Sequence, residues 1–128
     1  MLKFFFSSYK NEHGVCRETG MPIGYIKNGS KVFYPYRGVV YSYYEIKKII
    51  SYLRTLNAKG PKVKVFLHKD TRIVYDGFIA LGKIKENNDK QATFESFILR
   101  LDLTYLEQIA VVLKEYNSLQ ISWKKVGF

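Results

Sequence analysis

Cysteine and histidine are scarce in this chain, which has one cysteine and two histidines among 128 residues. The lone Cys16 cannot form an internal disulfide, which argues against a disulfide-stapled secreted module and favours a reducing compartment. Structural zinc sites take four nitrogen or sulfur ligands in paired spacing, and His13, Cys16 and His68 do not supply that pattern. We therefore expect no metal site and no cofactor.

Clustered carboxylates are also missing. Four acidic residues of the second half stand singly near predicted turns, where aspartate is common for local backbone reasons: Asp70, Asp76, Glu86 and Asp89. A nuclease would need carboxylates gathered around a divalent metal. Glycine-rich phosphate loops of Walker or dinucleotide spacing do not occur either. We expect a protein that is not an enzyme.

Long apolar runs are absent. Near the amino terminus only Leu2 and residues 4–6 are apolar, which is well short of a signal-peptide core or a membrane span. We expect a cytoplasmic protein without a membrane partner, located in the host cytoplasm if it is viral. Phe, Tyr, Ile, Lys and Asn make up 53 of the 128 residues, a bias typical of AT-rich genomes such as those of phage and archaeal viruses.

Acidic residues are few in the first half, where positive charge accumulates. Residues 1–64 carry twelve Lys or Arg against three Glu, a net charge of +9, whereas residues 65–128 carry nine against eight. Charge segregated in this way creates a one-sided field that attracts polyanions. The length and the 47% hydrophobic content are those of a single domain over 1–128.

Turn signals divide the first half. Residues 7–21 are polar and aperiodic, which predicts a long loop. Asn28–Gly29 between two alternating segments is a strong hairpin signal. Ser42 and Glu45 have the spacing of a capping box, so a helix is expected to begin there. One apolar stripe follows at helical spacing and predicts its buried face: Ile46, Ile49, Ile50, Leu53 and Leu56.

The second half repeats this alternation of strands and a helix. Strands are predicted over 62–68, 72–75, 78–81 and 92–101, then a helix that begins near Asp102 or Thr104, then a last strand over 119–123. Shifted by sixty residues the two helical stripes overlay, which suggests a strand–helix–strand repeat over 31–68 and 91–125. The fold class that follows is α+β, with an antiparallel sheet of about six to eight strands packed against two amphipathic helices.

Tyrosines are interleaved with the basic residues of the first half. In single-stranded nucleic-acid binding, exposed aromatic rings stack bases while cations follow the phosphates. We take Tyr34, Tyr36 and Tyr41 as stacking candidates. The phosphate candidates are Lys31, Arg37, Lys47, Lys48 and Arg54. Strand alternation further predicts that Tyr34 and Tyr36 share an exposed face while Phe33 is buried. The alternative is that these tyrosines are buried sheet residues with wet hydroxyls.

Two resemblances accompany this pattern. From Ile46 to Ile84, a short helix followed by Val63–Leu67, Lys69–Asp70 and Tyr75–Ile79 resembles the first half of an Sm-like RNA-binding barrel, over less than a third of the chain. Thr71 stands where that family usually has glycine, so its RNA-binding loops are not carried over. By topology alone, two β-rich units that each end in a helix resemble the whirly and PUR-repeat single-strand binders.

The sequence thus favours non-catalytic binding of nucleic acid, single-stranded DNA or RNA, through the basic and tyrosine-rich first half. The other interpretation is a small interaction module, an inhibitor or adaptor of viral or phage origin among them, whose basic face docks on an acidic partner protein. Both interpretations leave a homodimer open.

Overall fold

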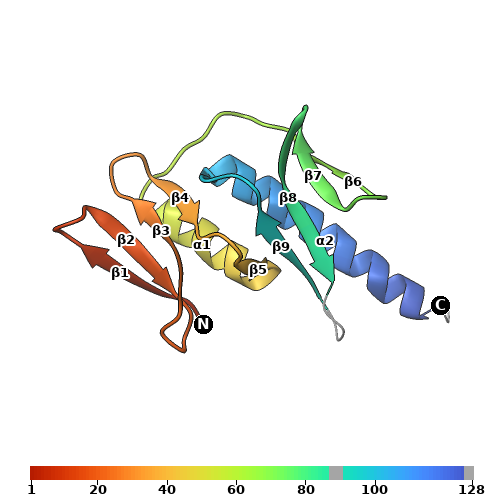
Figure 1. Ribbon diagram of the computed structural model, residues 1–128, viewed down its shortest axis with the longest axis horizontal. Coiled ribbons are helices and arrows are strands. Elements are labelled where there is room, and N and C mark those ends of the chain that lie inside the picture. Colours follow the sequence, from red (N-terminus) through yellow and green to blue (C-terminus); the bar gives the residue numbers. More distant parts are fainter. Residues whose placement is uncertain (87–90, 126–128) are drawn as a thin grey trace.

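The computed structural model describes residues 1–86 and 91–125, with side chains described up to Ser118. Within these residues the chain forms nine strands in two antiparallel sheets, together with two helices, so the predicted α+β class is confirmed. Figure 1 shows the two sheets next to each other, with α1 and α2 crossing behind them.

Sheet A is a meander of the first four strands in chain order: β1 (Lys3–Ser7), β2 (Glu12–Cys16), β3 (Pro22–Lys27) and β4 (Val32–Pro35). The predicted loop over 7–21 is therefore wrong, because β2 lies within it. His13 and Val15 are buried on one side of this strand and alternate with Gly14 and Cys16. Because two of these alternating positions hold a histidine and a glycine, the hydrophobicity pattern of the segment does not show the two-residue period of a strand.

Helix α1 (Tyr43–Thr55) begins where the capping box predicts. The Glu45 amide donates to Ser42 Oγ at 3.1 Å, and the Ser42 amide donates to Glu45 Oε1 at 3.1 Å. Ile46, Ile49, Ile50 and Leu53 of the predicted stripe are buried. The helix ends at Thr55 with Leu56 as its C-cap, and Asn57 after it takes the left-handed conformation that an asparagine tolerates there.

Sheet B has the order β5 (Val40–Ser42), β9 (Ala92–Ser96), β8 (Ile79–Glu86), β7 (Ile73–Asp76) and β6 (Phe66–His68). The predicted strand over 62–68 forms only at its end, and Gly77, with positive φ, makes a tight turn between β7 and β8. Helix α2 spans Leu103–Lys125, so the strand predicted over 119–123 is wrong. The Tyr105 amide donates to Asp102 Oδ1 at 3.0 Å, which makes Asp102 the cap rather than Thr104.

The structure consists of two units with the same order of elements. Unit 1 (residues 3–55) and unit 2 (residues 66–125) each contain a four-stranded meander, a short extended segment and a helix. These units are longer than the repeat predicted over 31–68 and 91–125. The strand that follows α1 is β6, the first strand of unit 2, and no strand follows α2 in the described residues. One continuous hydrophobic core draws on both units.

The two units exchange the segments that precede their helices. In unit 1 this segment is β5, which pairs with β9 of sheet B and not with a strand of sheet A. Tyr41 of β5 lies opposite Phe94 of β9. In unit 2 it is Leu101, which crosses in the other direction and pairs with Phe33 of β4. The exchange ties each helix to the sheet of the other unit.

A glycine packed against a phenylalanine ring recurs at corresponding places in the units. A Cβ on Gly24 of β3 would lie 2.6 Å from the Phe33 ring, and one on Gly82 of β8 would lie 2.4 Å from the Phe94 ring. Contacts below 3.0 Å do not occur for real Cβ atoms, so each ring requires its glycine. This shared detail makes the two units structural counterparts.

Candidate nucleic-acid interface

The two faces of sheet A differ in what covers them. On the inner face Phe4 stacks on Tyr52 of α1, with ring centroids 4.0 Å apart. On the same face, His13 Nδ1 forms a hydrogen bond of 2.7 Å with the Tyr52 hydroxyl. Because side chains alternate along a strand, Phe5, Gly14 and their neighbours in register point away from α1. We call this side the outer face of sheet A.

A row of aromatic residues crosses the outer face at one level of the register. Phe5 pairs with Gly14, Gly14 with Tyr25 and Tyr25 with Tyr34. The Tyr25 and Tyr34 rings are stacked, with centroids 5.0 Å apart and planes 4° from parallel. Phe5 is 56% exposed, which leaves its ring available to a ligand. The row provides ring surfaces without any helix over it.

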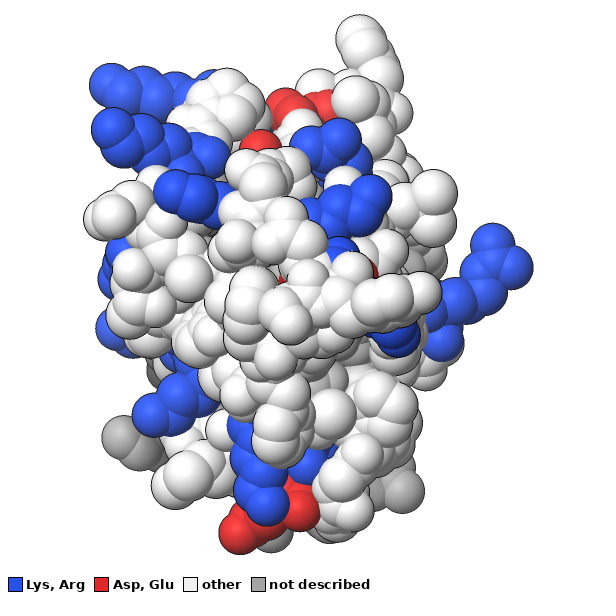
Figure 2. All heavy atoms as spheres, turned by 90° about the vertical axis from the view of Figure 1, so that its left-hand side faces the viewer, with Lys and Arg blue, Asp and Glu red and all other residues white. Residues whose placement is uncertain are grey.

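Cations lie at the Tyr34 end of this row. Lys27 Nζ is 4.8 Å from the Tyr34 ring centroid, and the Arg100 guanidinium is 6.0 Å from it. Arg100 belongs to unit 2 and reaches the site because Leu101 pairs with β4. Figure 2, which views the molecule from the side of β1 and β2, shows Lys and Arg side chains around a largely uncharged central area.

Tyr36 borders the aromatic row from the loop after β4. Its ring lies 6.1 Å from that of Tyr25 and is tilted by 53°. The pKa of the Tyr36 hydroxyl is raised above its ordinary value, mainly by partial burial and to a lesser extent by the negative charge of Glu12. The hydroxyl therefore stays protonated at neutral pH and can donate a hydrogen bond.

The structure places Tyr34 and Tyr36 as strand alternation predicts. Phe33 is 1% exposed, whereas Tyr34 is half-buried and Tyr36 is 42% exposed. Two of the predicted phosphate residues lie close to them in the chain. Lys31 occupies the β3–β4 turn in a left-handed conformation, and Arg37 is exposed in the loop after β4.

Tyr41 is not available for stacking, so that assignment is wrong. The residue is 1% exposed, and its hydroxyl donates a short hydrogen bond to the Ile23 carbonyl. Its ring meets the Phe33 ring edge-on, with centroids 5.7 Å apart. Burial raises the pKa of the Tyr41 hydroxyl well above its ordinary value. Tyr41 is a core residue because β5 crosses between the sheets.

The remaining predicted cations lie on α1 and not on the outer face. Lys47, Lys48 and Arg54 are exposed. Lys47 and Arg54 line a groove of about 290 Å³ between α1 and α2, where Arg54 contacts Glu107 at 2.6 Å. Because the inner face of sheet A packs on α1, these cations belong to a surface distinct from the aromatic row.

Sequence reasoning missed Phe5, Gly14, Tyr25, Lys27 and Arg100 as parts of the site. The hairpin signal at Asn28–Gly29 indicates that the strands on either side of it pair, but not their register. A two-residue turn would pair Tyr25 with Val32, whereas the observed turn over 28–31 pairs Tyr25 with Tyr34. Nothing local indicates Arg100, which arrives through the exchange between the units.

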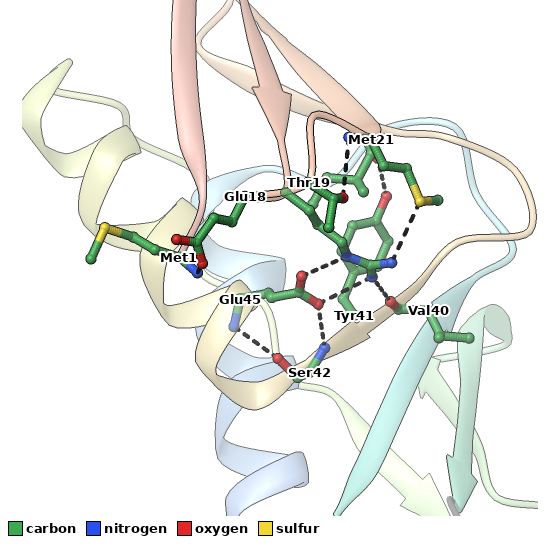
Figure 3. A network of polar contacts seen from close by, with 10 residues as sticks. Met1, Glu18, Thr19, Met21, Val40, Tyr41, Ser42 and Glu45 are labelled. Atoms are coloured by element: carbon green, nitrogen blue, oxygen red, sulfur yellow. Dashed lines mark hydrogen bonds and ion pairs between the residues drawn. The ribbon is translucent and has the colours of Figure 1, made fainter.

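A polar network at the start of α1 connects this helix to β5 and to the residue that follows β2 of sheet A. Arg17 Nε donates to Glu45 Oε2 at 2.8 Å, and an Arg17 amino group donates to the Val40 carbonyl at 2.6 Å. Figure 3 shows the hydrogen bonds between Glu45 and Ser42 at the start of α1. The same carboxylate accepts from Arg17, the residue after β2, so it both caps the helix and holds the end of that strand. Half-buried side chains with this many partners hold the strands in place rather than form a binding site.

Other kinds of site receive no support from the part of the chain that the structure describes. In residues 1–86 and 91–125, no three His, Cys, Asp or Glu side chains gather where they could hold a metal ion. No helix over the same residues is both long and apolar enough to cross a membrane. Comparison with protein-family models, with curated proteins and with solved structures finds no match.

Proposed function

We propose that this protein binds single-stranded nucleic acid, without catalysis, on the outer face of sheet A. The observation that carries the proposal is the row of Phe5, Tyr25 and Tyr34 with Lys27 and Arg100 at its end. Aromatic stacking contributes about 1 to 3 kcal/mol per base, and the neighbouring cations neutralise the phosphates. We place the protein in the cytoplasm, of the host if it is viral, on the basis of its lone cysteine.

A single strand suits this face better than a duplex. In a duplex the base faces are stacked on one another and only the edges are open, in grooves that take a helix or a ribbon. An exposed row of rings on an open sheet offers stacking to unpaired bases. The +9 charge of residues 1–64 adds long-range attraction for any polyanion.

The test is fluorescence anisotropy of a labelled oligonucleotide of mixed sequence at several salt concentrations. We expect log K to fall with log salt at a slope of about −0.7 per neutralised phosphate, and duplex of the same sequence to bind more weakly. Tyr34→Ala should weaken binding by about 1 to 3 kcal/mol. Phe78→Ala is the matched control, because this aromatic is fully exposed on the β7–β8 turn of sheet B. Equal effects of the two substitutions would contradict the proposal.

A second candidate is docking on a partner protein, for which the +9 charge of residues 1–64 suggests an acidic surface, and a separate observation favours a protein interface. Large apolar side chains lie exposed at the end of sheet B where β7 turns into β8 and β9 ends: Phe66, Phe78, Ile79, Phe97 and Leu99. Large apolar side chains exposed in this way are typical of protein interfaces, and the two aliphatic ones, Ile79 and Leu99, offer nothing to a stacked base.

Polyglutamate separates the two candidates, because it carries negative charge without bases. A surface that recognises acidic proteins through charge should bind polyglutamate as tightly as an oligonucleotide and should be insensitive to Tyr34→Ala. A nucleic-acid surface should prefer the oligonucleotide and lose that preference when Tyr34 is truncated.

A further inference from the structure

The aromatic row on sheet A is interrupted at one position. Gly14 of β2 stands in register between Phe5 of β1 and Tyr25 of β3. A Cβ built on Gly14 would have only one neighbour within 4 Å, the Phe5 carbonyl oxygen at 3.8 Å. Space is therefore open on this face of Gly14, with an aromatic residue on the strand to each side, and we call this space the recess.

The width of this recess matches one aromatic base. Phe5 and Tyr25 stand two strands apart, which is about 9.6 Å between their backbones for the usual spacing of neighbouring strands. A base held between two rings needs about 6.8 Å from ring to ring, twice the stacking distance of nucleic acids. A modest inward lean of the rings closes the difference, and a second base does not fit.

The far side of Tyr25 is already occupied. Tyr34 lies parallel to it at 5.0 Å, and Lys27, two residues along β3 from Tyr25, lies 4.8 Å from the Tyr34 ring. The stack thus runs from Tyr34 to Tyr25 and then opens at Gly14 before Phe5. The Tyr36 ring lies 6.1 Å from the Tyr25 ring, and its hydroxyl is a hydrogen-bond donor in the neighbourhood of the stack.

We propose that the recess above Gly14 holds one unpaired base of the bound strand, sandwiched between Phe5 and Tyr25. This inference rests on the proposed function and makes it more specific, since a sandwiched base must leave any duplex stack. Phosphates on the Tyr34 side of that base then come close to Lys27 and Arg100. Gly14 is the residue that determines access, because any larger side chain fills the recess.

Gly14→Val tests the proposal with little risk to folding. Gly14 does not have positive φ, the site has open space above it, and valine favours strands. The thermal midpoint should not fall. Affinity for an oligonucleotide should fall about 5- to 150-fold, the loss of one stacked base, while Gly14→Ala should have a smaller effect.

Comparison with Tyr34→Ala distinguishes failure of this inference from failure of the proposed function. Loss of binding in Tyr34→Ala together with full binding in Gly14→Val would overturn the recess and leave the function standing. Full binding in both variants would overturn the function itself.

Photocross-linking provides a readout on the unaltered protein. An oligonucleotide with 5-iodouracil in place of its thymines cross-links to rings that stack on the base, and mass spectrometry identifies the residue. We expect cross-links at Phe5 or Tyr25. Cross-links confined to other aromatic residues, such as Tyr44 on α1, would overturn the inference even if Gly14→Val failed to fold.

Discussion

Phe33 and Leu101 form a two-way backbone pair between the units. The Phe33 amide donates to the Leu101 carbonyl at 3.0 Å, and the Leu101 amide donates to the Phe33 carbonyl at 2.8 Å. Tyr41 and Phe94 form the counterpart on the other sheet. Because each unit pairs with the sheet of the other, the core residues at this crossing determine whether the proposed binding face forms at all.

Tyr41 should therefore behave as a core residue and not as a binding residue. Tyr41→Ala should lower the free energy of unfolding by about 3 to 5 kcal/mol, as large aromatic truncations do. Tyr41→Phe should cost about 1 kcal/mol, because it removes only the hydrogen bond to the Ile23 carbonyl, which also accepts from the Tyr36 amide. Urea unfolding gives both values. Loss of oligonucleotide affinity per folded molecule in Tyr41→Phe would contradict this assignment.

The glycines that face phenylalanine rings yield a second prediction. Gly24→Ala and Gly82→Ala should each destabilise the protein strongly, because the new methyl would overlap the ring and a nearby backbone oxygen. Gly14→Ala is the matched control on the same sheet, where the methyl meets open space. Thermal unfolding of the three variants measures the contrast. Equal midpoints for Gly24→Ala and Gly14→Ala would show that Phe33 can move aside at no cost.

Local signals in the sequence predict part of this structure. Ser42 and Glu45 locate the start of α1, and alternation predicts that Tyr34 is more exposed than Phe33. Alternation does not hold for Val32, which is buried although it lies on the same side of β4 as Tyr34. The burial of Tyr41 could not be predicted, because it follows from pairing with Phe94, far along the chain. The alternating residues of 119–123 suggest a strand, yet without a proline or glycine to end α2 the helix continues to Lys125.

The same division applies to the candidate site. Tyr34 and Tyr36 follow from a basic, tyrosine-rich segment with a strand period. The recess depends on Gly14, and a glycine in a polar segment gives no sign that it lies between two rings. Phe5 and Tyr25 flank Gly14 only because β2, which carries Gly14, lies between their two strands in sheet A.

Tyr105 predicts a change in stability at high pH. Its hydroxyl donates to Asp76 Oδ2 at 2.6 Å, and this hydrogen bond, followed by burial, raises the pKa of Tyr105 to about 12. An unfolded tyrosine loses its proton near its ordinary pKa of 10.0. The unfolded state therefore binds fewer protons between these two values, and the stabilisation, fully present below pH 10, is lost as the pH rises towards 12.

Urea unfolding across this interval tests the linkage. Tyr105→Phe should unfold with a shallower pH dependence than the unaltered protein, and the two curves should converge at the alkaline end. Substitution of Tyr9, an exposed tyrosine, by Phe serves as the control and should leave the slope unchanged. Parallel curves for Tyr105→Phe and the unaltered protein would mean that the contact with Asp76 does not persist in solution.

Lys27 and Lys48 provide the most direct test of which surface binds. Each is an exposed lysine beside a tyrosine ring, Lys27 at 4.8 Å from Tyr34 on sheet A and Lys48 at 5.2 Å from Tyr44 on α1. Lys27→Glu should weaken oligonucleotide binding and flatten the salt slope by about 0.7, the contribution of one phosphate on a single strand. Lys48→Glu changes the net charge equally but should leave the slope unchanged. A flatter slope in Lys48→Glu alone would move the binding surface to the helices, where the sequence had placed Lys47, Lys48 and Arg54. Equal flattening in both variants would indicate that charge alone, without the aromatic row, holds the strand.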